Sequence, residues 1–332
     1  MEFKVFEDKS GAFVFNAPGS KETADRFELL VEAFVDGRIH QKRMASICEN
    51  MMRDFPPLLR PYHILATIHL SKGKHAKALN TALRGLGAVN EMFPDDFCGP
   101  IPWHHDGNRP YLDLLKTILL CHIASRDFGK AAEWCGIVQR ADPDDSCGVR
   151  FVMGHALLRS GEQEKAQAWF VDHGTEYAPY YYELGLCHLR DEQYVQAATA
   201  FRRGIAINPY IAEMIFNGHV PNPYAVMHFW ANEMPPLAKQ YLGSYADLWE
   251  EALVEQRFLY WVFNHSLVLQ ERARLMACRE RRSINTSLPQ PKEQVAEYRA
   301  LIESIDDRLS FEIVRRRPNG DGAMEWPWEV YN

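Results

Sequence analysis

The chain has 332 residues and a formal net charge of −7, and 47% of its residues are hydrophobic. This composition is typical of a globular protein with a sizeable core, and the excess of acidic residues argues against a nucleic-acid surface over the whole chain. The seven cysteines contain no CxxC pair, the N-terminus has no apolar signal-peptide core, and the apolar stretch 258–269 is too short to cross a bilayer. We therefore expect a cytoplasmic protein with free thiols, no membrane contact and no nucleic-acid partner.

The first residues alternate between apolar and polar side chains. The segments "FKVF" and "AFVF" flank "EDKSG", a polar turn that ends in glycine. Two short alternating runs around such a turn predict a β-hairpin within residues 1–19. From Ser20 onward the apolar period becomes helical, and we expect no further strand.

Residues 178–210, "APYYYELGLCHLRDEQYVQAATAFRRGIAINPY", give the register of a repeated helical pattern. Small and large residues alternate at fixed intervals over two helical segments joined by a polar turn. The small residues are Gly185, Ala197 and Gly204, the large ones are Tyr181, Leu184, His188 and Phe201, and Pro209 ends the pattern. Small side chains let two helices approach closely, and proline cannot continue a helix.

The same register recurs upstream from Cys147, Leu112 and Leu59, and a degenerate copy spans residues 24–56. This pattern resembles the tetratricopeptide repeat (TPR), a helix–turn–helix unit of about 34 residues. The resemblance covers residues 24–209 and implies an all-α fold, a right-handed α–α superhelix of about five stacked repeats. We expect a hairpin cap at 1–19, repeats over 20–209, a non-repeat helical region over 210–317 and an aromatic tail over 318–332.

The loop "FCGPIPWHHDGNRP", residues 97–110, lies between two of the expected repeats. Extra residues between repeats are tolerated because they project from one face of the array, so we interpret this loop as an insertion. Trp103 is a candidate either to pack back on the array or to contact a partner. The adjacent histidines and Cys98 leave a metal-binding or hydrolytic loop open as an alternative, although their spacing is unlike that of zinc sites, and we expect no metal and no cofactor.

In the TPR family the first helices of successive repeats line a concave groove. The resemblance therefore implies groove-facing residues: Arg60, His63, Lys116, Phe151, His155, Arg159, Tyr182 and Arg190. This mixed aromatic and basic lining suits a peptide with some acidic character, because guanidinium groups pair with carboxylates and rings offer rigid contact area. Part of the lining is alternatively filled by the tail residues Trp326 and Trp328.

Beyond Pro209 the repeat register fades. One long helix is expected over about 245–282, with an apolar surface on every side over 257–270, and a last helix is expected over about 292–316. Residues 283–291 have a linker composition. The acidic pair at 306 and 307 is expected on a solvated helix surface. The basic run 315–317 is interpreted as complementing a helix C-terminus, with an acidic-partner site as the alternative.

The resemblance implies a non-enzymatic scaffold or adaptor that binds a protein or peptide in its groove. Two alternatives remain. One is a metal-binding or hydrolytic protein that uses loop 97–110. The other is an obligate homodimer built on the apolar helix 257–270.

Overall fold

A computed structural model describes residues 1–226, 228, 230–250, 252–284 and 292–329. The protein is mostly helical, as the sequence predicts: the described residues contain seventeen α-helices and two small two-stranded sheets. The chain divides into two compact units, Met1–Glu162 (unit 1) and Gln163–Asn332 (unit 2), and each is considered by itself. The division falls inside segment 20–209, which the sequence analysis assigned to one array.

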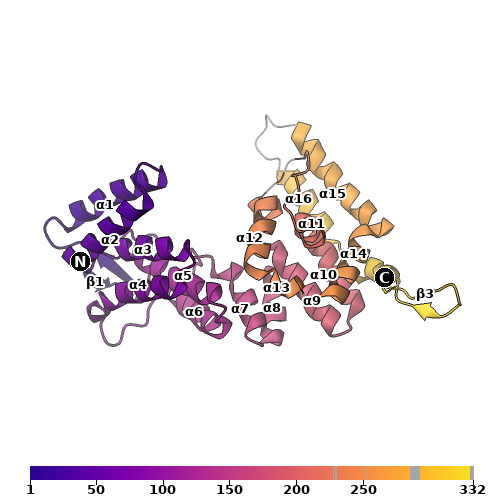
Figure 1. The fold of residues 1–332 in the computed structure, drawn as a ribbon, viewed down its shortest axis with the longest axis horizontal. Helices are drawn as coiled ribbons and strands as arrows, with labels where there is room; N and C mark the ends of the chain where they lie inside the picture. The colour runs from indigo at the N-terminus through magenta and orange to yellow at the C-terminus, as the bar shows by residue number, and fades with distance from the viewer. Residues whose placement is uncertain (227, 229, 251, 285–291, 330–332) are drawn as a thin grey trace. The chain divides into compact units, whose positions relative to one another are not determined.

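Unit 1 begins with a hairpin and continues with seven α-helices (Figure 1). Its elements are β1 (Glu2–Val5), β2 (Gly11–Val14), α1 (Ser20–Val35), α2 (Gln41–Asp54), α3 (Arg60–Leu70), α4 (His75–Gly87), η1 (Asn90–Met92), α5 (Arg109–Ala124), α6 (Phe128–Ala141), η2 (Val149–Phe151) and α7 (Met153–Arg159). Consecutive helices from α2 to α7 pack against each other. Proline near the first position of α3 and of α5 favours a helix start there, because its fixed φ already suits the helix.

The predicted N-terminal hairpin is confirmed: β1 and β2 pair antiparallel, with Phe3 opposite Phe13. Both rings contact Phe93, at centroid distances of 4.5 and 5.4 Å. Phe13 belongs to the apolar core of unit 1, which continues through Phe27 of α1 and Leu65 of α3. The hairpin is therefore an integral part of this core.

Loop 97–110 holds the hairpin in place. The buried Asn108 side chain accepts a hydrogen bond from Phe13 N (2.9 Å) and donates to Gly11 O (3.0 Å). A Cβ on Gly99 or Gly107 would lie about 2 Å from a carbonyl oxygen of the hairpin, so only glycine permits this approach. The segment interpreted as an insertion is a clamp between the hairpin and the helices.

Unit 2 contains ten α-helices and a second, shorter hairpin among its described residues. Its elements are α8 (Gln163–His173), α9 (Ala178–Arg190), α10 (Tyr194–Ile207), α11 (Tyr210–Asn217), η3 (Ala231–Glu233), α12 (Pro235–Tyr245), α13 (Asp247–Glu250), α14 (Leu253–Asn264), α15 (Ser266–Ile284), α16 (Lys292–Glu303), α17 (Asp307–Ile313), β3 (Arg317–Pro318) and β4 (Met324–Glu325).

The small residues of the repeated pattern lie where α9 and α10 pack closely. A Cβ on Gly185 would be 2.6 Å from the Phe201 ring, and one on Gly204 would be 2.9 Å from the Tyr182 ring. Ala197 and Phe201 are fully buried. In unit 1, a Cβ on Gly85 of α4 would likewise lie 2.9 Å from the Tyr62 side chain. The steric role assigned to these residues is confirmed.

Several expectations for the C-terminal region are wrong. The segment 245–282, expected as one helix, contains the end of α12 and the separate helices α13, α14 and α15. At His265 the backbone is extended, and its Nδ1 accepts a hydrogen bond from Leu267 N (3.3 Å). His265, in the middle of the polar run Asn264–Ser266, thus separates α14 from α15. The last helix is also broken, because Asp306 is the N-cap of α17. The strand pair β3–β4 was not expected at all. Most of the predicted linker, 285–291, lies outside the described residues.

The apolar surface expected over 257–270 is largely covered inside unit 2. Phe258, Leu259 and Val262 are fully buried, while Tyr260 and Leu269 are half exposed. The tail covers part of this surface, since Trp328 is buried with its ring 4.6 Å from that of Phe258. The apolar surface expected on one helix over 257–270 is therefore divided between α14 and α15, and only part of it is exposed.

Buried polar contacts attach the C-terminal helices to α10. Arg202 is 2% exposed and binds both carboxylate oxygens of Glu271 in α15, at 3.0 and 2.6 Å. It also donates to Asp306 O (2.7 Å), and Asp307 accepts a hydrogen bond from Thr199 (2.6 Å). Asp306 therefore contributes its backbone carbonyl, and Asp307 one carboxylate oxygen, to the attachment of α17 to α10. The Asp306 side chain is 44% exposed and Asp307 is exposed, as expected for a solvated acidic pair.

Candidate partner-binding surface

Three of the groove candidates lie on α3 and α5 of unit 1. Arg60 and His63 project from α3, and Lys116 from α5. Arg60 is bridged by Asp113 (3.0 Å) and by Glu28 of α1 (3.1 Å), whereas Lys116 is exposed and makes no ion pair within the described residues. The positive charge of Arg60 is thus compensated by two carboxylates, whereas the charge of Lys116 is exposed to solvent.

His63 belongs to a short hydrogen-bond chain between the two helices. The Thr117 hydroxyl donates to Asp113 O (2.7 Å), so it accepts from His63 Nδ1 (3.1 Å), which fixes the proton on that nitrogen. Burial lowers the pKa of His63 below its ordinary value, and the nearby Arg60 and Lys116 act in the same direction against the opposing effect of Asp113. The ring is therefore neutral at pH 7 and offers Nε2 as an acceptor.

The candidates on and before α7 have different surroundings. The Arg159 guanidinium lies 4.8 Å from the ring centroid of Phe128, and the Arg150 guanidinium lies 4.5 Å from the ring centroid of Phe151. His155 is buried, with 1% of its surface exposed. Phe151 and Arg159 are partly exposed and can contact a partner, whereas His155 offers it almost no surface.

In unit 2 the two candidates on α9 differ from each other. Arg190 is exposed and pairs with Glu255 (3.3 Å), but Tyr182 is fully buried and donates its hydroxyl proton to Asn208 O (2.8 Å). Burial raises the pKa of Tyr182 well above its ordinary value. Tyr182 is thus a packing residue, because chain that follows the repeat pattern covers this part of α9.

Loop 97–110 keeps Trp103 partly exposed, while its neighbour His105 stacks on Phe6 of the hairpin turn at 5.2 Å. Cys98 is exposed, and the other six cysteines are buried. Burial raises the pKa of the Cys48, Cys135 and Cys187 thiols to about 12, so they are protonated at neutral pH. Nowhere in the described ranges do three metal-ligating side chains converge.

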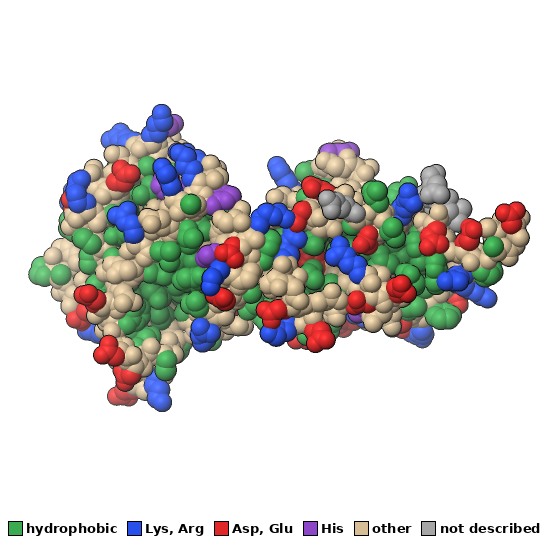
Figure 2. Space-filling model, turned by 60° about the horizontal axis from the view of Figure 1, so that its bottom comes forward, with side chains coloured by type: hydrophobic (Ala, Val, Ile, Leu, Met, Phe, Trp, Pro, Cys, Tyr) green, Lys and Arg blue, Asp and Glu red, His purple; other side chains and the backbone are tan. Residues whose placement is uncertain are grey.

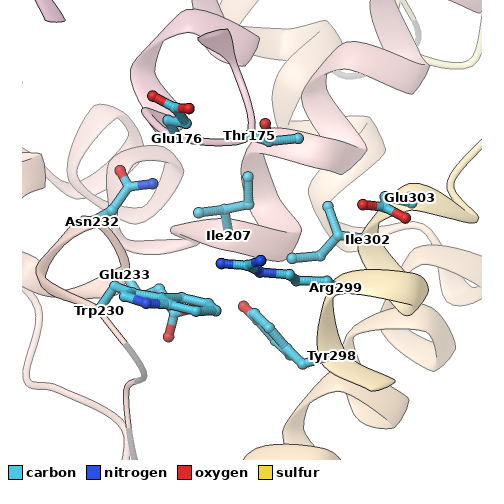
Figure 3. Close-up of a pocket in the computed structure, with 10 residues that line it drawn as sticks. All are labelled: Thr175, Glu176, Ile207, Trp230, Asn232, Glu233, Tyr298, Arg299, Ile302 and Glu303. Atoms are coloured by element: carbon cyan, nitrogen blue, oxygen red, sulfur yellow. The ribbon is translucent and has the colours of Figure 1, made fainter. Parts of the chain in front are cut away.

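A pocket in unit 2 that sequence reasoning missed has a volume of about 400 Å³ (Figure 3). Its walls come from the turn before α9, the end of α10, the segment around η3, and α16. The Arg299 guanidinium lies 5.3 Å from the centroid of Trp230, and the Tyr298 ring is 6.1 Å from that of Trp230. Glu233 is buried beneath and pairs with the buried Arg279 (3.4 Å).

This pocket combines an indole face, a guanidinium group and the side-chain amide of Asn232 (Figure 3). Such groups recognise flat or charged parts of a ligand. Trp230 and Arg299 belong to segments far apart in the sequence, and neither lies in the repeat pattern. No short motif therefore marked the pocket.

Acidic and basic side chains are interspersed over the face seen in Figure 2, with hydrophobic side chains gathered between them. A surface of this kind favours recognition by local contacts over long-range steering by one sign of charge. Among the described residues no helix combines the length and apolar character of a membrane span. Neither the protein-family models nor the curated proteins compared with the chain give a match.

Proposed function

We propose that the protein is a non-enzymatic interaction scaffold built on TPR-like repeats that form a right-handed superhelix. In this proposal the first helices of the repeats bind a peptide or a segment of a partner protein, and the protein acts in the cytoplasm. The seven free cysteines support a reducing compartment, where thiols persist without pairing.

The observation that carries the proposal is the arrangement of α3 and α5. Their apolar side chains pack against neighbouring helices: Ala66, Leu112 and Ile118 are fully buried. The side chains of Arg60, Asp113 and Lys116 remain partly or fully exposed on the same two helices. A rigid pair of helices that presents ordered polar groups loses little entropy when a partner binds.

The expected partner is mildly acidic rather than strongly so. Glu28 and Asp113 compensate Arg60, which leaves Lys116 as the exposed cation of this row. An acidic side chain bound by Lys116, next to a hydrogen-bond donor that His63 Nε2 accepts from, would give local contacts of moderate strength. This supports a transient complex with a short peptide.

Affinity purification with the full chain tests the proposal. Lys116→Glu is compared with wild type and with Lys77→Glu, the same exchange at an exposed site on α4, the second helix of its repeat. We expect Lys116→Glu to lose at least one partner that wild type and Lys77→Glu retain. If all three proteins recover the same partners, partners do not bind at Lys116 and the proposal for this surface is wrong.

A further inference from the structure

A second cleft lies in unit 2, between the start of α10 and the end of α17. Its volume is about 370 Å³, which accommodates one or two side chains. Tyr194 and Val195 form one wall, and Phe311 and Val314 form the other, with Trp326 of the tail between them. It involves none of the groove candidates.

The cleft has a prearranged aromatic floor. The Tyr194 ring lies 4.7 Å from Trp326, and Trp326 stacks on Trp328 at 4.9 Å and an angle of 18°. Because Trp328 is buried against Phe258, the tail holds this floor in place. Phe311 adds an aromatic side chain that is 62% exposed. Because these rings already have fixed positions, an apolar ligand group would bind here with little entropy cost for ordering the cleft.

The rim of the cleft is basic. Arg315 and Arg316 line it, and the Arg316 guanidinium lies 4.3 Å from the centroid of Trp326. Neither guanidinium forms an ion pair within the described residues. Arg317, in contrast, is turned toward Trp261 (5.0 Å). Glu192 is the one carboxylate among the lining residues.

The basic run 315–317, interpreted as complementing a helix C-terminus, lies just beyond the last turn of α17. The helix α17 ends at Ile313, and its last turn contains no basic residue. Arg315 and Arg316 follow the C-cap Val314, and the Arg316 guanidinium lies over the Trp326 ring. Two guanidinium groups without an ion pair in the described residues therefore lie on the rim of this cleft, near the exposed Phe311.

We propose that this cleft binds a partner peptide in which an apolar anchor residue is flanked by carboxylates. The anchor enters between Phe311 and Tyr194, and the carboxylates pair with Arg315 and Arg316. A concave site of this size fits a side chain of a peptide better than the flat headgroup layer of a membrane. The rim pairs would make the affinity fall as salt concentration rises.

Fluorescence anisotropy with the full chain tests the proposal. The probes are three labelled synthetic dodecapeptides of Asp and Glu with a central Leu, Phe or Trp, and a control peptide with Lys at every acidic position. We expect saturable binding of at least one acidic probe and none of the control. The double variant Arg315→Glu, Arg316→Glu should weaken binding about tenfold or more, and Phe311→Ala several-fold.

Two variants with the same type of charge reversal serve as controls. Lys239→Glu is an exposed site on α12, and Lys77→Glu is an exposed site on α4 of unit 1, outside the proposed groove. Both should bind the probe as wild type does. Probe binding that is lost in Lys116→Glu and kept in the double variant would place the probe in the groove of unit 1 and overturn this proposal without overturning the groove proposal. Unchanged circular dichroism and melting temperature would show that the variants are folded.

Three further results would overturn the proposal. The first is that wild type binds none of the acidic probes, or that the double variant binds them unchanged. The second is binding to phosphatidylserine vesicles, lost in the double variant, without binding of a peptide probe. The third is a dimer in sedimentation that dissociates in the double variant, which would make the occupant a second copy of this chain.

Discussion

The two non-repeat ends of the chain are attached to the helices in different ways. The N-terminal hairpin of unit 1 is held by an aromatic cluster and by one neutral side chain, Asn108. The C-terminal helices of unit 2 are held to α10 by buried charges, chiefly the pair Arg202–Glu271. Removing one partner of a buried neutral hydrogen bond costs about 1–3 kcal/mol of unfolding free energy, whereas removing one partner of a buried ion pair costs about 3–5 kcal/mol. The C-terminal attachment is therefore the more sensitive one.

The largest effect is expected from Glu271→Gln. The exchange keeps the shape of the side chain but leaves Arg202, which is 2% exposed, without its carboxylate. Loss of one partner of a buried pair costs about 3–5 kcal/mol of unfolding free energy. Urea denaturation followed by tryptophan fluorescence measures this loss. Arg281→Ala, which removes an exposed pair with Glu297, serves as the control and should leave the midpoint unchanged.

Asn108→Ala tests the neutral attachment and should have a smaller effect. It removes hydrogen bonds with Phe13 N, Gly11 O and Pro102 O, at about 1 kcal/mol each. Hydrogen exchange should accelerate in residues 2–14 while α9 and α10 remain protected. The exposed Asn16→Ala is the matched control. If the hairpin stays as protected in Asn108→Ala as in Asn16→Ala, loop 97–110 is not its clamp.

Gly185→Ala tests the close packing of α9 on α10. The added methyl group would lie 2.6 Å from the Phe201 ring, and such overpacking costs about 1–3 kcal/mol. Gly243→Ala in α12, where nothing lies within 4 Å, should instead stabilise by a few tenths to about 1 kcal/mol. Thermal melting of the two variants should therefore shift in opposite directions. Shifts of the same sign would contradict the steric role of Gly185.

The smallest effect concerns pH. The pKa of His63 is lowered in the folded state, so below pH 6.5 the unfolded chain takes up a proton that the folded chain does not. Stability is therefore lost as the pH falls through this range, and His63→Gln should reduce that loss. Denaturation midpoints at pH 7 and pH 5 measure the difference. The NMR titration of His63 should give a pKa below 6.5. A pKa above 6.5 would contradict this prediction, because protonation of His63 would then stabilise the folded state as the pH falls.

Local patterns in the sequence predicted most of the packing. Gly185, Gly204 and Phe201 were identified by their spacing, which directly reflects how two successive helices fit together. The N-terminal hairpin was identified in the same way, from alternation around a polar turn. Such features depend on residues close together in the chain, and these are what a single sequence displays.

Features that depend on distant contacts could not be predicted. The Tyr182 hydroxyl donates to Asn208 O, 26 residues further along the chain, and Asp307 accepts a hydrogen bond from Thr199, 108 residues before it. The break at His265 was visible as a polar run, but its effect on the helix depended on how α14 and α15 pack. The unit 2 pocket and the basic-rimmed cleft join segments that show no pattern of their own.

Site-specific photo-crosslinking tests the central claim, partner binding by the first helices of the repeats, most directly. A benzoylphenylalanine placed at position 116 on α5 or at position 77 on α4 reports which helix contacts a partner in cells. We predict a discrete crosslinked product from position 116 that is absent from position 77. A product from position 77 alone, or none from position 116, would contradict the claim.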